Sequence, residues 1–214
     1  MMQKLIFNLI LLSFMTSAIA QTEVSSPAGE YYLRGVMETA SGFKLNPDKS
    51  FEFFFSYGAL DRMGKGNWSV EGDSLVLSSG GKPPDGFGLV GSKKTGDTMI
   101  TIRISEENEI FLKSVYCIIS GGGKTQESIS DAKGMISFQP QEIDSIQLLF
   151  EFCPEKRSVF TIKGSADNSF EFRFEASMMD VFFNKFRLKS EPTQLSGPHP
   201  LMKGESFIYK KAGR

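Results

Sequence analysis

Hydrophobic and polar residues alternate one by one along most of the chain, which is the two-residue period of β-strands. The clearest example is Phe170–Glu175, where three phenylalanines alternate with three charged residues. On a strand, the phenylalanines would lie on the core face and the charged side chains would face water. The same alternation predicts strands at Phe51–Phe55 and Met99–Ile104.

Turn sequences separate these strands at intervals of roughly eight to twelve residues. Gly72 and Asp73 lie between two apolar runs, Asn67–Val70 and Ser74–Leu77, and so predict a β-hairpin. No stretch of about a dozen residues has the spacing of an amphipathic helix. The nearest, Glu175–Phe186, is better explained as a turn followed by a strand that ends at Leu188. The pattern therefore predicts an all-β protein of about twelve to fourteen strands.

The composition changes between Gly80 and Gly96, where six glycines and two prolines occur. Such a stretch cannot hold a central strand. We interpret residues 83–96 as a Gly/Pro-rich linker between two β regions; a long loop within one domain is the alternative. The predicted organisation is an N-terminal antiparallel meander at residues 28–82, packed with a C-terminal β-sandwich at residues 97–210.

The N-terminal residues have the pattern of a secretory signal peptide. Lys4 gives a positive start, the apolar run Leu5–Met15 follows, and Ala18-Ile19-Ala20 forms a small-residue cleavage site before Gln21. A membrane anchor is the alternative, but the apolar run is short for a bilayer span, and no later segment would span a membrane as a helix. We therefore expect cleavage after Ala20 and a periplasmic or secreted protein.

The overall composition is that of an ordinary folded protein, with 40% hydrophobic and 23% charged residues. It excludes a disordered chain, a collagen-like repeat and a polytopic membrane protein. Lys and Arg together number 24, against 25 for Asp and Glu. The net charge is therefore near zero, and it gives no indication that the chain binds nucleic acid.

Cys117 and Cys153 are the only cysteines. In an oxidising compartment they can form a disulfide, which would stabilise the fold by about 4 kcal/mol. Two separate buried thiols are the alternative. The strand phase is relevant, because the alternating apolar residues from Ile146 to Phe152 would share the core face and Cys153 would lie on the other. Two cysteines and one histidine cannot make a cysteine-rich zinc site.

In the first β region, aromatic strands alternate with glycine and aspartate turns. The segments are Gly29–Leu33, Leu45–Phe51, Gly66–Ser69 and Gly72–Leu77. Over about fifty residues this pattern resembles the lipocalin-like β-meander of many exported bacterial proteins. That family often holds an apolar ligand inside a barrel. Small-ligand barrels use about eight strands, and the four or five expected here cannot close one alone, so the ligand cavity is not carried over.

In the second region, Val115–Ile119 is followed by Ser128–Phe138, in which Asp131 and Gly134 form a turn before an apolar strand. This order resembles the transthyretin-like or carboxypeptidase-regulatory β-sandwich. The turn residues fit, because Asp bonds its own backbone and Gly adopts positive φ. The resemblance implies a structural or adhesive module.

Candidate catalytic groups are few. His199 is the only histidine, and Gly197–Pro200 predicts a solvated surface turn around it. A serine nucleophile would need this histidine as its base and an acid to orient it. Gly86–Gly91 fits the spacing G-x-G-x-x-G but lacks the strand before it and the helix after it that a dinucleotide site needs. The acidic run Glu106–Glu109 matches no calcium loop and predicts a solvated turn. We therefore predict no catalytic residue, no cofactor and no metal.

The most distinctive predicted loop, Ser56–Gly66, joins two aromatic strands and contains Tyr57, Leu60, Asp61 and Arg62. Loops on rigid sheets often carry binding function, so these four residues are the candidate ligand or partner residues. The alternative is a wide hairpin in which Tyr57 and Leu60 cover the core.

The sequence favours a non-catalytic exported protein, with a role in binding or envelope interactions and an unidentified partner. The alternative is a lipocalin-like carrier of a small apolar ligand, whose phenylalanine-rich faces would line an open cavity. A packed sandwich would fill those faces with one another instead. An uncharacterised hydrolase is the third hypothesis.

Overall fold

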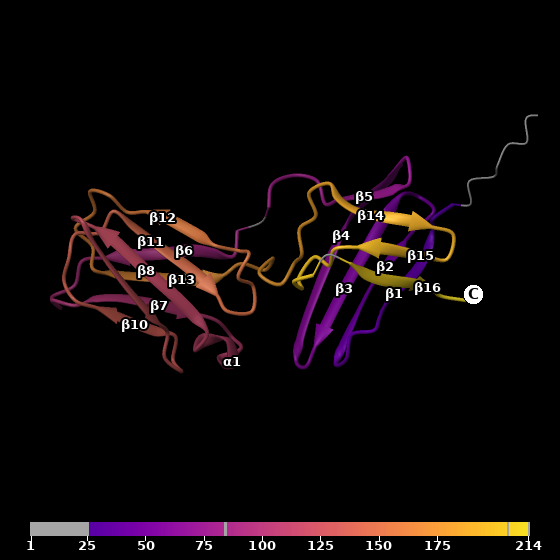
Figure 1. Cartoon of the computed structure of the whole chain (residues 1–214). Helices are drawn as coiled ribbons and strands as arrows, with labels where there is room; N and C mark the ends of the chain where they lie inside the picture. The colour runs from indigo at the N-terminus through magenta and orange to yellow at the C-terminus, as the bar shows by residue number, and fades with distance from the viewer. Residues whose placement is uncertain (1–25, 84, 205, 214) are drawn as a thin grey trace, which may run out of the picture.

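The computed structural model describes residues 26–83, 85–204 and 206–213. Regular structure in these residues is almost entirely strand, numbered β1 to β16 and labelled in Figure 1 where there is room. The one helix among them is the single turn α1 (Glu109–Leu112). It begins at Glu109, where the side chain of Asn108 accepts a hydrogen bond from the amide of Ile110. Glu106 and Glu107 of the acidic run lie before the helix, so only Glu109 departs from the expected turn. The predicted signal peptide lies outside the described residues.

Eight strands close into an antiparallel barrel in the order β1-β16-β15-β14-β5-β4-β3-β2. Pairing of β1 with β16, in which Leu33 lies opposite Tyr209, joins the two ends of the described chain. The strands are β1 (Gly29–Arg34), β2 (Thr39–Leu45), β3 (Ser50–Tyr57), β4 (Leu60–Glu71), β5 (Ser74–Ser78), β14 (Phe186–Glu191), β15 (Gln194–Gly197) and β16 (Phe207–Lys211).

The remaining strands form two four-stranded sheets, in the orders β10-β7-β13-β6 and β12-β11-β8-β9. We call them together the two-sheet unit; Figure 1 places it beside the barrel. Within it, β13 pairs parallel with β7 and antiparallel with β6. The strands are β6 (Phe87–Lys93), β7 (Ile100–Ser105), β8 (Val115–Gly121), β9 (Lys124–Ile129), β10 (Met135–Phe138), β11 (Ser145–Phe150), β12 (Ser158–Thr161) and β13 (Ser169–Phe174).

Strand pairing divides the chain differently from the expected boundaries. Residues 28–82 supply five barrel strands. The other three are β14 to β16, which the sequence assigned to the separate C-terminal region at residues 97–210. The five N-terminal strands thus do not close a barrel alone, as expected, but the three later strands complete one, which the sequence did not predict. The expected linker at residues 83–96 contains β6, which is an edge strand. A period of two identifies a strand but not its distant partner, which is why the pattern missed this arrangement.

The barrel interior is filled with aromatic and aliphatic side chains. Phe51, Phe53 and Phe55 of β3 all point inward, as the alternation predicted. Phe183, from the segment between β13 and β14, packs edge-on against Phe51 and Phe53, with ring centroids 5.1 and 5.3 Å away. The other buried members are Tyr31, Phe43, Leu45, Trp68, Leu75, Leu77, Val181, Leu188, Leu195 and Tyr209.

One hydrophobic cluster includes residues from both sheets of the two-sheet unit. Phe170 and Phe172 of β13 are buried, as predicted, and the rings of Phe172 and Phe160 are 4.6 Å apart between centroids. Phe174 is only half-buried, but its ring centroid lies 4.9 Å from that of Phe150 on the other sheet. The remaining buried members are Phe87, Ile100, Ile102, Ile104, Leu112, Val115, Cys117, Ile119, Ile136, Phe138, Ile143, Ile146, Leu148, Cys153 and Met178.

Both cysteines are buried free thiols in this cluster. Burial raises the pKa of Cys117 to about 12 and that of Cys153 to about 11. Cys153 was expected on the outer face of its strand, and Phe152 on the core face. Instead, β11 ends at Phe150, and a turn closed by the bond from the Cys153 amide to the Phe150 carbonyl, at 3.0 Å, brings Cys153 inward and leaves Phe152 exposed.

One hairpin prediction and one turn-and-strand prediction are confirmed, with one difference. The hairpin between β4 and β5 turns at Gly72, whose φ of 64° suits glycine. Glu175–Phe186 forms turns and then β14, as the sequence favoured, but β14 continues to Glu191.

Candidate binding cleft between the barrel and the two-sheet unit

A buried arginine joins the barrel to the two-sheet unit. Arg62 lies on β4 and is 2% exposed, and its guanidinium forms an ion pair with Glu155, in the turn before β12. It also donates hydrogen bonds to the carbonyls of Met179 and Asp180, at 3.3 and 3.4 Å. These last two residues belong to the segment that leads from β13 back to β14. Arg62 therefore holds together β4, the turn before β12 and the segment between β13 and β14.

Lys156, the residue after Glu155, is also buried. Its ammonium donates a hydrogen bond to the carbonyl of Ser177. Burial lowers the pKa of Lys156, and the nearby positive charge of Arg62 lowers it further. Both cations of this junction thus hold backbone carbonyls of the same connecting segment.

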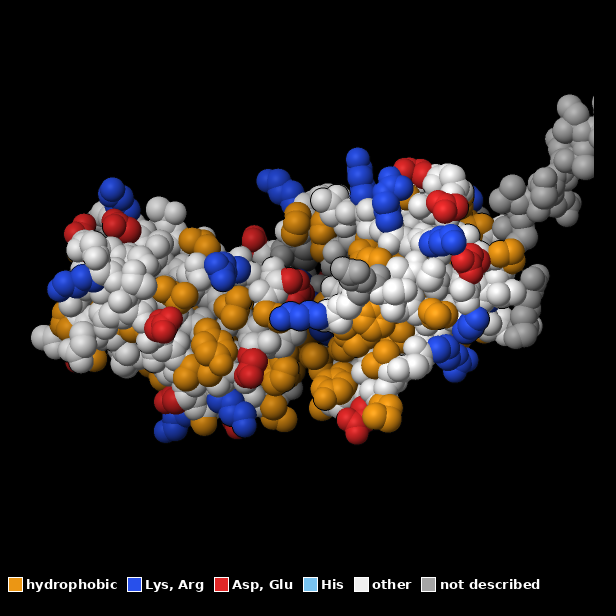
Figure 2. Space-filling view, viewed as in Figure 1, with side chains coloured by type: hydrophobic (Ala, Val, Ile, Leu, Met, Phe, Trp, Pro, Cys, Tyr) orange, Lys and Arg blue, Asp and Glu red, His pale blue; other side chains and the backbone are white. Residues whose placement is uncertain are grey.

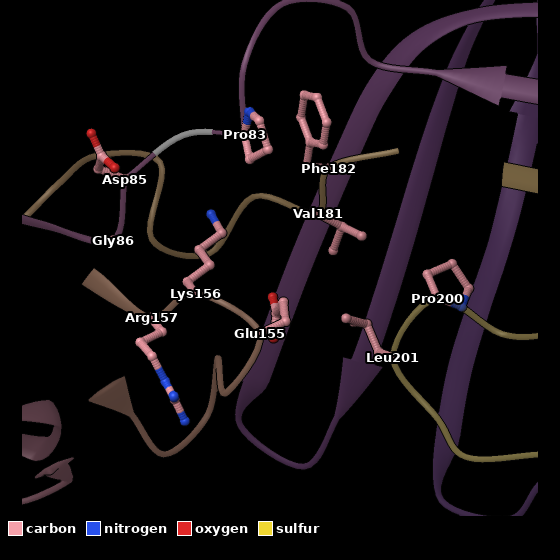
Figure 3. A pocket seen from close by; sticks show the side chains of 10 residues that line it. All are labelled: Pro83, Asp85, Gly86, Glu155, Lys156, Arg157, Val181, Phe182, Pro200 and Leu201. Carbon is pink, nitrogen blue, oxygen red and sulfur yellow. The ribbon is translucent and has the colours of Figure 1, made fainter. Parts of the chain in front are cut away.

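The junction borders a hollow of about 310 Å³. Figure 3 shows its lining, which combines charged side chains with apolar ones such as Phe182 and Leu201. It lies between the two connections that link the barrel to the two-sheet unit, residues 79–86 and 175–185. The lining residues are Pro83, Asp85, Gly86, Glu155, Lys156, Arg157, Val181, Phe182, Pro200 and Leu201.

A second hollow, of about 550 Å³, lies on the barrel side of the same segment. Val181 and Phe182 line both hollows, and we call the two together the junction cleft. Residues that line only the second hollow include Lys82 and Met63, and Met63 is 64% exposed. In Figure 2 the surface is hollowed where the two parts meet, with charged and hydrophobic side chains next to one another.

Gly64 explains how the connecting segment can lie directly on β4. The amide of Val181 donates to the carbonyl of Met63 at 2.6 Å, and Asp180 forms a parallel bridge with Met63. A Cβ atom at Gly64 would lie 2.6 Å from the ring of Phe183 and 2.8 Å from the carbonyl oxygen of Val181. Only glycine therefore allows this approach without displacement of the segment.

The candidate residues of the predicted Ser56–Gly66 loop are dispersed by the structure. Gly58 and Ala59 alone form the turn between β3 and β4, since Tyr57 and Leu60 are already a strand pair. Tyr57 is 53% exposed, Leu60 packs against the barrel core, and Asp61 is exposed. Of the four, Arg62 alone reaches the junction, where its ion-pair partner is Glu155.

His199 is buried inside the barrel, whereas the sequence predicted a solvated turn. Its Nδ1 accepts hydrogen bonds from the amides of Leu201 and Met202, at 3.0 and 3.2 Å. Nε2 must then carry the proton, and it donates to the hydroxyl of Ser41 at 3.1 Å. Burial lowers the pKa of His199 to about 4. With both nitrogens engaged, the imidazole holds the β15–β16 connection in place and is not available as a general base.

Sequence reasoning missed Glu155, Lys156 and Phe182. The first two lie in a charged run after a strand, a pattern that normally indicates a solvated turn. Glu155 pairs with Arg62 of β4, more than 90 residues earlier, and buried Lys156 bonds to the Ser177 carbonyl. No local pattern reports such contacts. Phe182 lies in the segment that the sequence predicted to be a turn followed by a strand, and that pattern gave it no role in a site.

The part of the chain that the structure describes holds no group of three or more His, Cys, Asp or Glu side chains placed to bind a metal. No helix there has the length and apolar character to cross a membrane. In comparisons with known proteins, no family model and no curated protein matches this chain.

Proposed function

We propose that this chain is a non-catalytic exported binding protein of the cell envelope, and that a partner protein docks at the junction cleft. The scaffold would be a lipocalin-like barrel joined to a β-sandwich. The observation that carries the proposal is the cleft itself, where side chains from the barrel, the two-sheet unit and both connections meet around Phe182.

The chemistry of the cleft suits a protein surface. Apolar Phe182, Leu201 and Met63 alternate with the charged groups of Asp85 and Lys82. Protein interfaces commonly combine aromatic and methionine contacts at the centre with a polar rim. Arg62 and Lys156 would hold this surface rigid rather than contact the partner, since their polar atoms already bond within the chain.

The packing of the barrel supports a partner protein over the alternative of an apolar-ligand carrier. A carrier needs space inside the barrel, and this interior is filled by inward rings, by Phe183 and by His199. The hydrolase hypothesis has less support, because His199, the only histidine, has both ring nitrogens engaged inside the barrel.

Export is proposed on the N-terminal sequence. The mature protein should begin at Gln21, and N-terminal sequencing of the protein from the envelope or medium tests this. Recovery of Met1 at the N-terminus would reject cleavage.

Site-specific photo-crosslinking tests the docking site. A photoreactive phenylalanine analogue is placed at Phe182, and, as a matched control, at Val70, which is exposed at the other end of β4. Both variants are expressed in the source cells, and adducts are compared after irradiation. We expect a discrete adduct from position 182 and none from position 70. Identical adducts from both positions, or no adduct from 182, would reject the cleft as the docking site.

A further inference from the structure

A row of apolar side chains crosses the outer face of the sheet β12-β11-β8-β9. The register places Tyr116 of β8 between Ile129 of β9 and Leu149 of β11. In the next row, Ile118 and Gln147 are paired, and Gln147 also lies opposite Val159 of β12. These five apolar residues, Ile129, Tyr116, Leu149, Ile118 and Val159, are called here the outer strip.

The outer strip is open to solvent although it is apolar. Tyr116 is 45% exposed, Ile129 44% and Val159 60%, while the alternate residues of β8 are completely buried in the hydrophobic cluster. The strip borders a hollow of about 420 Å³, a volume within the range of small-molecule sites, roughly 300–1,000 Å³. Figure 2 shows hydrophobic side chains on the visible face of the two-sheet unit.

A cation stands at one end of the strip. Leu148 lies opposite Ser158, so the same register, continued by one residue, places Arg157 beside Leu149 at the end of the row. Arg157 lines the hollow and is exposed, and no carboxylate of the described residues lies within ion-pair distance of it. In Figure 3 its side chain runs away from that of Lys156. Glu127, the one acid of the lining, is on β9, at the opposite edge of the sheet.

We propose that the outer strip binds a free amphiphile that has one carboxylate and one unbranched apolar chain. The guanidinium of Arg157 would bind the carboxylate, a pairing that its planar fork favours. The chain would then cover Leu149 and Tyr116 and remove their exposed surface from water. Arg157 also borders the first hollow of the junction cleft, but the apolar residues of the strip do not line that cleft. The inference does not depend on the proposed docking function.

The charges argue for a free amphiphile rather than an anionic membrane surface. A membrane would cover the whole face at once, so Glu127 would be held against its negative headgroups. A single bound chain can satisfy Arg157 at one edge and end before it reaches Glu127. The compact volume of the hollow also suits one molecule.

Isothermal titration calorimetry with decanoate tests the site in the purified protein. Decyltrimethylammonium, with the same chain and opposite charge, and butyrate, with the same carboxylate and a short chain, are the ligand controls. We expect saturable binding of decanoate alone. Arg157→Gln should weaken it by about tenfold, because a charge-assisted hydrogen bond is lost, and Tyr116→Ser should weaken it as well.

Two matched variants separate this site from other positive charges and from the cleft. Lys163→Gln removes an exposed cation outside the hollow, and Phe182→Ala alters the cleft; both should leave decanoate affinity unchanged. Thermal melts of every variant establish that it is folded. Absence of saturable decanoate binding, or equal affinity in Arg157→Gln, Tyr116→Ser and the unchanged protein, would overturn the proposal.

The other possible occupants give different results. If a second copy covers the strip, with Arg157 of each copy against Glu127 of the other, sedimentation will show a dimer that Arg157→Gln dissociates. If a membrane covers it, the protein will float with phosphatidylglycerol vesicles and will not bind monomeric decanoate. Either result would reject the free-amphiphile site.

Discussion

Arg62 of the barrel and Glu155 of the two-sheet unit form an ion pair at the point where the two parts of the molecule meet. The arginine is almost completely buried, whereas the carboxylate side chain is 47% exposed. Because the same guanidinium also binds two backbone carbonyls of the returning segment, the pair forms the centre of a small hydrogen-bonded junction. It connects residues that lie 93 positions apart in the chain.

Removal of this guanidinium should destabilise the protein. Arg62→Met keeps much of the apolar stem but leaves the carbonyls of Met179 and Asp180 without their donor. We expect the free energy of unfolding to fall by about 2 kcal/mol. Arg103→Met is the control, because Arg103 forms an exposed pair with Glu171 at 3.9 Å, and it should cost under about 1 kcal/mol. Equal losses in denaturant melts would contradict the role given to Arg62.

Phe172 should be a principal core residue of the two-sheet unit. It is 0% exposed and packs against Phe160. Phe172→Ala should cost about 3–5 kcal/mol, through lost burial and a residual cavity. Arg173→Ala, one position along the same strand, should cost under about 1 kcal/mol, because its pair with Glu175 is exposed. Small and similar losses for both variants would show that Phe172 does not have this core role.

Gly64 and Gly91 provide a matched pair of glycine substitutions. Gly64→Ala introduces a Cβ within 2.8 Å of the Val181 carbonyl oxygen, whereas nothing lies within 4 Å of a Cβ at Gly91. We expect Gly64→Ala to cost about 1–3 kcal/mol, as overpacking does. Gly91→Ala should be neutral or stabilising by up to about 1 kcal/mol. A loss of stability in Gly64→Ala alone would show that the close contact at Gly64 is required. Equal losses in both variants would instead indicate a general effect of replacing a glycine.

The buried imidazole of His199 predicts acid sensitivity. Its pKa falls from the ordinary value of 6.5 to about 4 in the folded protein, so folding favours the neutral ring. The resulting stability is fully present above pH 6.5 and is lost as the pH falls toward 4. The loss should reach about 3 kcal/mol. His199→Gln cannot take up this proton, so it should lack this part of the pH dependence in melts between pH 7 and 4. An unchanged slope in that variant would assign the effect to other groups.

The local features of the fold were predictable because they depend on neighbouring residues. Alternation located β3, β7 and β13 and the side chains that they bury, and Gly72 marked its hairpin. The closure of the barrel was not predictable in this way. It needs β14 to β16 to return after the whole two-sheet unit, and a strand pattern does not specify a partner more than 100 residues away.

The candidate site was likewise predictable only where it depends on neighbouring residues. Arg62 stood out because it lies in a glycine-rich segment between aromatic strands, but its ion pair joins two distant parts of the chain. The sequence indicated surface charges at Glu155 and Lys156. Glu155 does stay half exposed, but Lys156 is buried where its ammonium meets the connecting segment. His199 appeared solvated because its flanking prolines indicate a turn, and nothing in the sequence shows that this turn enters the barrel.

The central claim, that function resides in the junction cleft, is tested most directly by quantitative affinity capture from an envelope extract. The unchanged protein is compared with Phe182→Asp, and with Val70→Asp as a control of equal charge on the same barrel, after melts have shown both to be folded. We predict that a defined partner is retained by the unchanged protein and by Val70→Asp, and is lost from Phe182→Asp. Retention of the same partner at the same level by Phe182→Asp would contradict the claim.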